Sequence, residues 1–262
     1  DLLIYLLKGI SFWGTRGRKM GVAHPTTDLF VAKALFATIT NANFDPDRFI
    51  VLIEQAIEHR ENLRAAAQEK CQELHNNPCP GNGPDWAHWM PSSYDQDMLL
   101  EKASEVGVMA DPDLNPDVRA LRELIIYGLK GMAAYVDHAY VLETEDPEIL
   151  AFMQEMLEAT TQDKLSVEEL TGLVLETGTM GLRTMALLDT ANTNAYGHPE
   201  PTLVNLGVRP GPGILVSGHD LRDIDELLQQ TQGTGVNVYT HGEMLPANAY
   251  PAFKKYDHFV GN

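Results

Sequence analysis

Strong helix starts follow one another through the first 190 residues, and no strand pattern separates them. Several place a capping Asp or Asn directly before proline, the residue favoured at the first helical position. These pairs are Asp45-Pro46, Asn115-Pro116 and Asp146-Pro147. Ser166 and Glu169 add a capping box. Because consecutive helices without intervening strands pack as bundles, the sequence predicts a mainly α-helical bundle domain over residues 1–195.

The positions of the helices follow from these starts. We expect helices over about residues 1–20, 27–40 and 116–142, with others opening at residues 46 and 147. Thr26 or Thr27 is expected to open the second helix. The Pro- and Gly-rich stretch 75–93 is expected to be loop. Residues 2–9 match residues 124–131 at six of eight positions, which favours two related three-helix units within the bundle.

The pattern changes after residue 195. A Pro- and Gly-rich connection is followed by an apolar strand at 214–217, a helix from Asp220 to about 230, and a strand at 236–239. Strand, helix and strand over such a short span form a βαβ unit with parallel strands. A single βαβ unit cannot cover both faces of its sheet. We therefore predict that residues 196–262 are the first, incomplete portion of a Rossmann-like α/β domain.

Polar residues follow both predicted strands. His219 comes two residues after the first strand, and His241 and Glu243 follow the second. Ligands of parallel sheets bind beyond the carboxyl ends of the strands, where these side chains would converge. Imidazole and carboxylate both bind iron-class metals, and both also serve in acid–base catalysis. The simpler alternative for His219 is an ordinary hydrogen bond beside the Asp220 helix cap.

Charge and cysteine content exclude several classes of protein. Lys plus Arg number 19 against 37 Asp plus Glu, a formal net charge of −18. So acidic a surface repels phosphate backbones and anionic lipid, and no apolar run is long enough to span a bilayer. We expect no nucleic-acid or membrane partner. Cys71 and Cys79 fit no common zinc spacing, and so few cysteines indicate a cytoplasmic protein.

Both ends of the chain lie within expected elements. An apolar helical run begins directly after Asp1, and the last residues, 258–262, look like a strand that is just beginning. From these element boundaries we expect the sequence to be part of a longer polypeptide.

Several segments, taken together, resemble one family. The longest is Val238-Tyr239-Thr240-His241-Gly242-Glu243-Met244-Leu245-Pro246-Ala247, and others are residues 215–221, 230–236, 250–256 and 260–262, with 1–4, 36–43 and 128–131 upstream. These segments resemble the hybrid cluster proteins, also called prismane proteins or hydroxylamine reductases. The resemblance covers nearly the whole chain apart from the Pro- and Gly-rich stretch around 75–95.

The resemblance implies a fold, a cofactor and an activity. The family has a helical N-terminal domain with a 4Fe-4S cubane, followed by two α/β domains and a hybrid iron–sulfur–oxygen cluster. By motif, His219 and Glu243 are similar to the histidine and the first glutamate that bind the hybrid cluster. The implied activity is reduction of hydroxylamine to ammonia, or of nitric oxide, with electrons from a donor that the sequence does not identify.

This chain departs from the family pattern in its cysteines. The cubane cysteines of the family precede the segment that begins here at Asp1, and the cysteines and second glutamate of the hybrid cluster follow residue 262. Cys71 and Cys79 match neither set. Because iron–sulfur chemistry needs thiolates, we expect this stretch alone to be inactive. Two alternatives remain: a cluster-free helical scaffold derived from the family, and a relative of carbon monoxide dehydrogenase.

Overall fold

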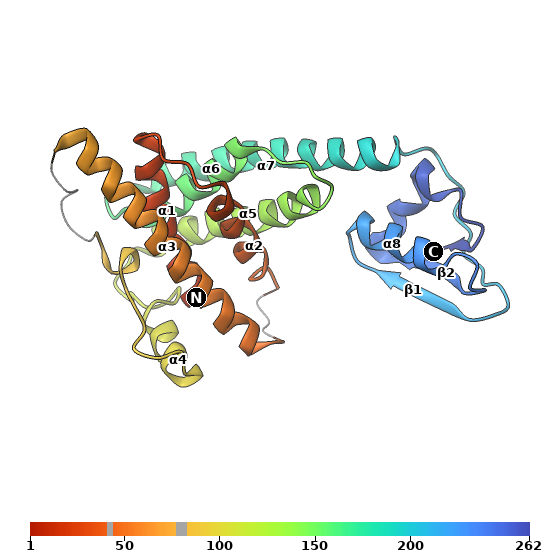
Figure 1. Ribbon diagram of the computed structural model, residues 1–262, viewed down its shortest axis with the longest axis horizontal. Helices are drawn as coiled ribbons and strands as arrows, with labels where there is room; N and C mark the ends of the chain where they lie inside the picture. Colours follow the sequence, from red (N-terminus) through yellow and green to blue (C-terminus); the bar gives the residue numbers. More distant parts are fainter. Residues whose placement is uncertain (41–43, 77–82) are drawn as a thin grey trace. The chain divides into compact units, whose positions relative to one another are not determined.

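The computed structural model describes residues 1–40, 44–76 and 83–262 (Figure 1). These residues form two units. The helical unit comprises Asp1–Asp137 and Asp146–Thr184, and the sheet unit comprises His138–Glu145 and Met185–Asn262. The long helices α5 and α7 each contribute residues to both units. The predicted domain boundary between residues 195 and 196 is not tested by this division and stays a prediction.

The helical unit is built around α1 (Leu2–Lys19), which packs against α3 (Pro46–His75) and α6 (Pro147–Ala159). Leu6 and Ile10 have no exposed surface, as expected for a helix that is covered by neighbours. The other helices of this part of the chain are α2 (Pro25–Phe36), η1 (Asp85–Ala87), α4 (Gln96–Glu105), α5 (Pro116–Tyr140) and α7 (Val167–Tyr196).

Most predicted helix starts are confirmed by their caps. The Asp45 carboxylate accepts a hydrogen bond from the Arg48 N–H at 2.9 Å, and Asp146 accepts one from the Glu148 N–H at 3.0 Å. Ser166 and its partner Glu169 exchange the two hydrogen bonds of a capping box. The sequence therefore fixes these starts through local hydrogen bonds.

The predicted start of the second helix was wrong. The helix α2 begins at Pro25, with His24 as the N-cap and no side-chain cap hydrogen bond. Proline lacks an N–H and has a fixed φ, so it occupies the first helical position and sets the start. Thr27 is instead buried inside the unit, where its hydroxyl lies 3.0 Å from the Nδ1 of His59.

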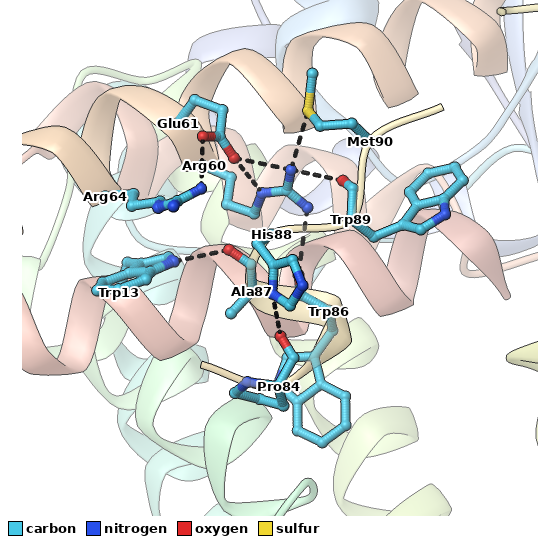
Figure 2. A network of polar contacts seen from close by, with 10 residues as sticks. All are labelled: Trp13, Arg60, Glu61, Arg64, Pro84, Trp86, Ala87, His88, Trp89 and Met90. Atoms are coloured by element: carbon cyan, nitrogen blue, oxygen red, sulfur yellow. Dashed lines mark hydrogen bonds and ion pairs between the residues drawn. The ribbon is translucent and has the colours of Figure 1, made fainter. Parts of the chain in front are cut away.

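The buried guanidinium of Arg60 connects part of the predicted loop to α3 through hydrogen bonds (Figure 2). Arg60 has no exposed surface. It donates to the carbonyl oxygens of Trp86 at 3.3 Å and Trp89 at 2.6 Å. Glu61, 2.8 Å away, compensates its charge. Because a buried cation is costly without such partners, these contacts hold the segment after residue 83 in one conformation.

The same segment is also fastened to α1. The indole N–H of Trp13 donates to the Ala87 carbonyl oxygen at 2.9 Å. Within the expected loop 75–93, residues 85–87 form the short 3-10 helix η1, and residues 77–82 lie outside the described part.

The sheet unit carries the predicted βαβ pattern. Its elements are β1 (Gly213–Ser217), α8 (Leu221–Thr231), β2 (Asn237–His241), η2 (Gly242–Ala249), η3 (Pro251–Phe253) and β3 (Phe259–Gly261). The strands lie in the order β1-β2-β3, and both pairs are parallel. The predicted fold class, helices followed by the start of a parallel α/β sheet, is confirmed.

The helix α8 supplies much of the core of the sheet unit. Ile224 and Leu228, one helical turn apart, are fully buried in the same cluster as Val238 of β2. Leu215 of β1 is 67% exposed, so β1 is far less covered than the β2 strand beside it. No helix in the described part of the chain combines the length and the apolar character needed to cross a membrane.

Candidate metal centre

Two parallel strands end together at the candidate site. The register pairs Ser217, the last residue of β1, with His241, the last residue of β2. His219 and Glu243 each lie two residues beyond this pair, because the segments after both strands have the same length. The backbone therefore brings the two residues to equivalent positions at one edge of the sheet.

A glycine lets the chain turn directly after each strand. Gly218 has a φ of +141° and Gly242 a φ of +56°, a region that side chains with a Cβ rarely adopt. After the first turn, the Asp220 side chain caps α8 by accepting from the Arg222 N–H at 2.7 Å. This cap fixes the residue next to His219.

The structure brings His219 and Glu243 into direct contact through the imidazole Nε2 and the carboxylate Oε2. Their side chains are 67% and 69% exposed, so the pair is accessible from solvent. This contact agrees with the convergence expected from sequence. An imidazole nitrogen and a carboxylate oxygen that meet at one point can share a proton or hold a cation between them.

His241 was expected to converge with His219 and Glu243, but its ring contacts a different residue. Its Nδ1 lies 3.4 Å from the Ser217 hydroxyl oxygen, across the end of the β1–β2 pair. Among the described residues, no hydrogen bond or ion pair joins His241 to the His219–Glu243 pair.

A buried hydroxyl supports the end of β2, and sequence reasoning missed it. Thr240 has no exposed surface, and its Oγ1 accepts from the Asn248 amide at 2.9 Å. The same hydroxyl lies 3.0 Å from Asn262 Oδ1 and 3.2 Å from the Gly261 carbonyl oxygen, the acceptors for its hydrogen. These bonds connect β2, β3 and η2, and η2 carries Glu243.

Asp220 has a second partner besides its helix cap. Its Oδ2 lies 3.5 Å from the Nδ1 of His138, at the end of α5 in the sheet unit. Burial opposes ionisation of Asp220, but the nearby His138 imidazole and the hydrogen bond from the Arg222 N–H outweigh it and lower the pKa of the carboxyl. As a carboxylate, Asp220 therefore contacts both the start of α8 and the end of α5.

The donors fit part of an iron site. An imidazole and a carboxylate meet on the exposed edge of a sheet, and both are iron ligands. Among the described residues, no group of three or more His, Cys, Asp or Glu is placed to hold a metal ion. Cys71 is buried on α3 and disulfide-bonded, so it offers no thiolate, and Cys79 lies outside the described residues.

The fold and the site together define a class of protein, in which a helical region is followed by a parallel α/β sheet with histidine and glutamate at its carboxyl edge. The whole chain, residues 1–262, matches the Prismane/CO dehydrogenase family. The chain belongs to this family, and the resemblance seen in the sequence is confirmed.

Several relatives of the chain carry the name hydroxylamine reductase. The chain is 56% identical over 262 residues to a hydroxylamine reductase of Halothermothrix orenii and 55% identical over 264 residues to one of Natranaerobius thermophilus. A hydroxylamine reductase of Parabacteroides distasonis is 53% identical over 268 residues. All of this chain is covered in each case, against 46% of each relative. The chain thus spans about half the length of the curated relatives it matches.

Proposed function

We propose that this chain is part of an oxidoreductase that reduces hydroxylamine to ammonia, with His219 and Glu243 as ligands of a hybrid iron–sulfur–oxygen cluster. The observation that carries the proposal is the direct contact between the His219 imidazole and the Glu243 carboxylate at the sheet edge. The names of the relatives support the substrate. Nitric oxide is the alternative substrate, and a 4Fe-4S cubane would belong to the complete protein.

The chemistry assigns distinct tasks to the chain and to the cluster. Reduction of hydroxylamine breaks its N–O bond and takes up two electrons and two protons, giving ammonia and water. A bound cluster would supply the electrons and an exchangeable coordination position. His219 and Glu243 would hold it, while the hydrogen bond between Thr240 and Asn248 joins the end of β2 to the last turn of η2. Without a cation between them, the imidazole and carboxylate can share a proton.

The test uses His219→Ala and Glu243→Gln in the complete polypeptide that contains this chain, purified without oxygen. We expect both variants to lose the iron of the hybrid cluster and hydroxylamine reduction together. His198→Ala and Glu155→Gln are matched controls, because both residues are exposed and neither has a partner among the described residues. Full iron content and activity in His219→Ala would refute the assignment.

A second candidate function is a cluster-free scaffold. One observation favours it for the chain taken alone: no cysteine falls within residues 196–262, and iron–sulfur clusters need thiolate ligands. Iron analysis of the 262-residue chain, expressed by itself under anaerobic conditions, separates the two candidates. We expect it to bind no iron–sulfur cluster, while the complete polypeptide does. Absence of iron from both would favour the scaffold.

A further inference from the structure

A cavity of about 370 Å³ in the helical unit collects an unusual set of charges. Cationic side chains line it from two helices: Lys8 on α1, and Arg119, Arg122 and Lys130 on α5. The chain has only 19 Lys plus Arg and a net charge of −18. Concentration of cations in one cavity of so acidic a protein calls for a physical reason, because like charges repel one another there.

The cations lie deep and the acids lie at the rim. Lys130 is 8% exposed and the Arg122 side chain 13%, and both Lys8 and Arg119 are partly buried. The acidic residues that also line the cavity are Asp1, Glu105, Asp111, Glu123 and Asp163, and all except Glu123 are exposed.

Two of the rim acids already have partners. Asp163 lies 3.3 Å from Arg122, and Glu105 lies 3.3 Å from Lys102. The deep part of the cavity therefore has one carboxylate, that of Glu123, for four cations. Backbone carbonyl oxygens accept from three of these cations: Leu114 from Arg119 at 3.4 Å, Gln162 from Arg122 at 2.9 Å and Thr38 from Lys130 at 3.3 Å. Opposite charges at the rim are exposed to water and compensate the buried cations only weakly.

Several donors around the cavity lack an acceptor. Lys8 has neither a hydrogen bond nor an ion pair within 4 Å among the described residues. The Nε groups of Arg119 and Arg122 and the indole Nε1 of Trp86 are buried, and none has a hydrogen-bond partner in the described part of the chain. Unpaired buried donors are costly, so such a group points to a ligand that supplies acceptors.

Burial lowers the pKa values of the two lysines that line the cavity. Desolvation lowers the pKa of Lys8, and the nearby Glu123 offsets it only in part. The pKa of Lys130 is lowered for the same reason. A bound anion would stabilise both ammonium groups in their charged form.

We propose that this cavity is a binding site for a small oxyanion, a phosphate, sulfate or carboxylate group, with the Lys8 ammonium as a principal contact. Oxyanions offer several acceptors at once, which matches ammonium and guanidinium donors that converge on one space. Hydroxylamine and nitric oxide carry no negative charge, so the site is independent of the proposed reduction.

Binding is tested by calorimetric titration of the complete polypeptide that contains this chain with inorganic phosphate, sulfate and acetate, with sodium chloride at equal ionic strength as the blank. We expect saturable binding at one site per chain. Binding of phosphate and sulfate alone would identify a tetrahedral anion as the source, and binding of acetate as well would identify a carboxylate. Absence of saturable binding by all of these anions would overturn the proposal.

The variant Lys8→Met locates the site, and Lys19→Met is its matched control. Both residues lie on α1, but Lys19 is exposed and does not line the cavity. We expect Lys8→Met to weaken binding about tenfold or more, as for loss of a charged hydrogen bond, and Lys19→Met to leave it unchanged. An equal effect of both variants would show general charge attraction and refute the site.

Two further measurements guard against a variant that fails to fold. Without anion, Lys8→Met should raise the thermal midpoint, because it removes a buried charge that has no partner. A lowered midpoint would indicate a structural role for Lys8. In the unmodified chain, phosphate should protect Lys8 but not Lys19 from amine acylation, measured by peptide mass spectrometry. Equal labelling of Lys8 with and without phosphate would contradict the proposal.

Discussion

Gly9 is the position where a single methyl group should disturb the helical unit most. It lies on α1, and a Cβ added there would overlap the Trp86 carbonyl oxygen and lie 3.0 Å from the carbonyl carbon and 3.1 Å from Arg60 Cδ. The carbonyl is fixed backbone and is also an acceptor for Arg60. Gly9→Ala must therefore move the segment 84–90 away from the helix.

The cost can be worked out from these contacts. Overpacking of a core costs about 1–3 kcal/mol. Loss of a hydrogen bond between a charged group and its acceptor adds about 1.5–3 kcal/mol if the Trp86 carbonyl leaves Arg60. Against this, alanine is favoured over glycine in a helix by about 1 kcal/mol. The balance predicts that Gly9→Ala lowers the free energy of unfolding by about 1.5–5 kcal/mol.

Urea denaturation followed by circular dichroism measures the change. Gly178→Ala is the matched control, because Gly178 lies within α7 and a Cβ there meets nothing within 4 Å. It should raise stability by about 0.5–1 kcal/mol, since alanine loses less backbone entropy on folding. Opposite signs for the two variants are expected. A Gly9→Ala variant as stable as Gly178→Ala would refute the close packing of segment 84–90 on α1.

Three other predictions concern the sheet unit and the surface. Thr240→Val removes a fully buried hydroxyl that accepts from the half-buried Asn248 amide and donates toward Gly261 and Asn262, although the amide keeps the Leu245 carbonyl oxygen as an acceptor. It should cost about 1–3 kcal/mol in urea denaturation, while Thr240→Ser should recover most of that loss. The lowered pKa of Asp220 means that the unfolded chain binds more protons in acid. Its stabilising contribution is complete above the unfolded pKa of about 3.9 and is lost as the pH falls through the lower folded pKa, so Asp220→Asn should flatten the acid limb of a pH–stability curve. Arg183 pairs with Asp146 and Glu148 on the surface at 2.6 Å each, and Arg183→Ala should leave the thermal midpoint nearly unchanged because solvent screens such pairs. A larger loss in thermal denaturation would show that this pair of bridges acts as a network.

Features decided by neighbouring residues could be predicted from the sequence. The caps at Asp45 and Asp146 depend on hydrogen bonds two or three residues away, and they are where the sequence placed them. The start of α2 was predicted too late because a threonine cap was preferred over proline at the first helical position, although Pro25 is a local signal. The burial of Thr27 beside His59, in contrast, is a tertiary contact. Tertiary contacts of that kind leave no local pattern.

The candidate site likewise contains some residues that could be predicted from the sequence and others that could not. His219 and Glu243 could be predicted, because each follows a strand and parallel strands end at one edge. Thr240 could not, since a threonine in a strand has no local sign of a buried hydroxyl that contacts a later loop. The cavity around Lys8 was also missed, because its cations come from helices more than 100 residues apart in sequence.

The meeting of His219 and Glu243 follows from the backbone alone. Both residues lie two positions beyond the registered pair Ser217 and His241, and both follow a glycine with positive φ. The strand register and the two glycine turns are enough to explain the contact. Residues 196–262 contain no cysteine, so this part of the chain offers no thiolate ligand beside the imidazole and the carboxylate. The proposed cluster at this edge would therefore take its thiolate ligands from other parts of the protein.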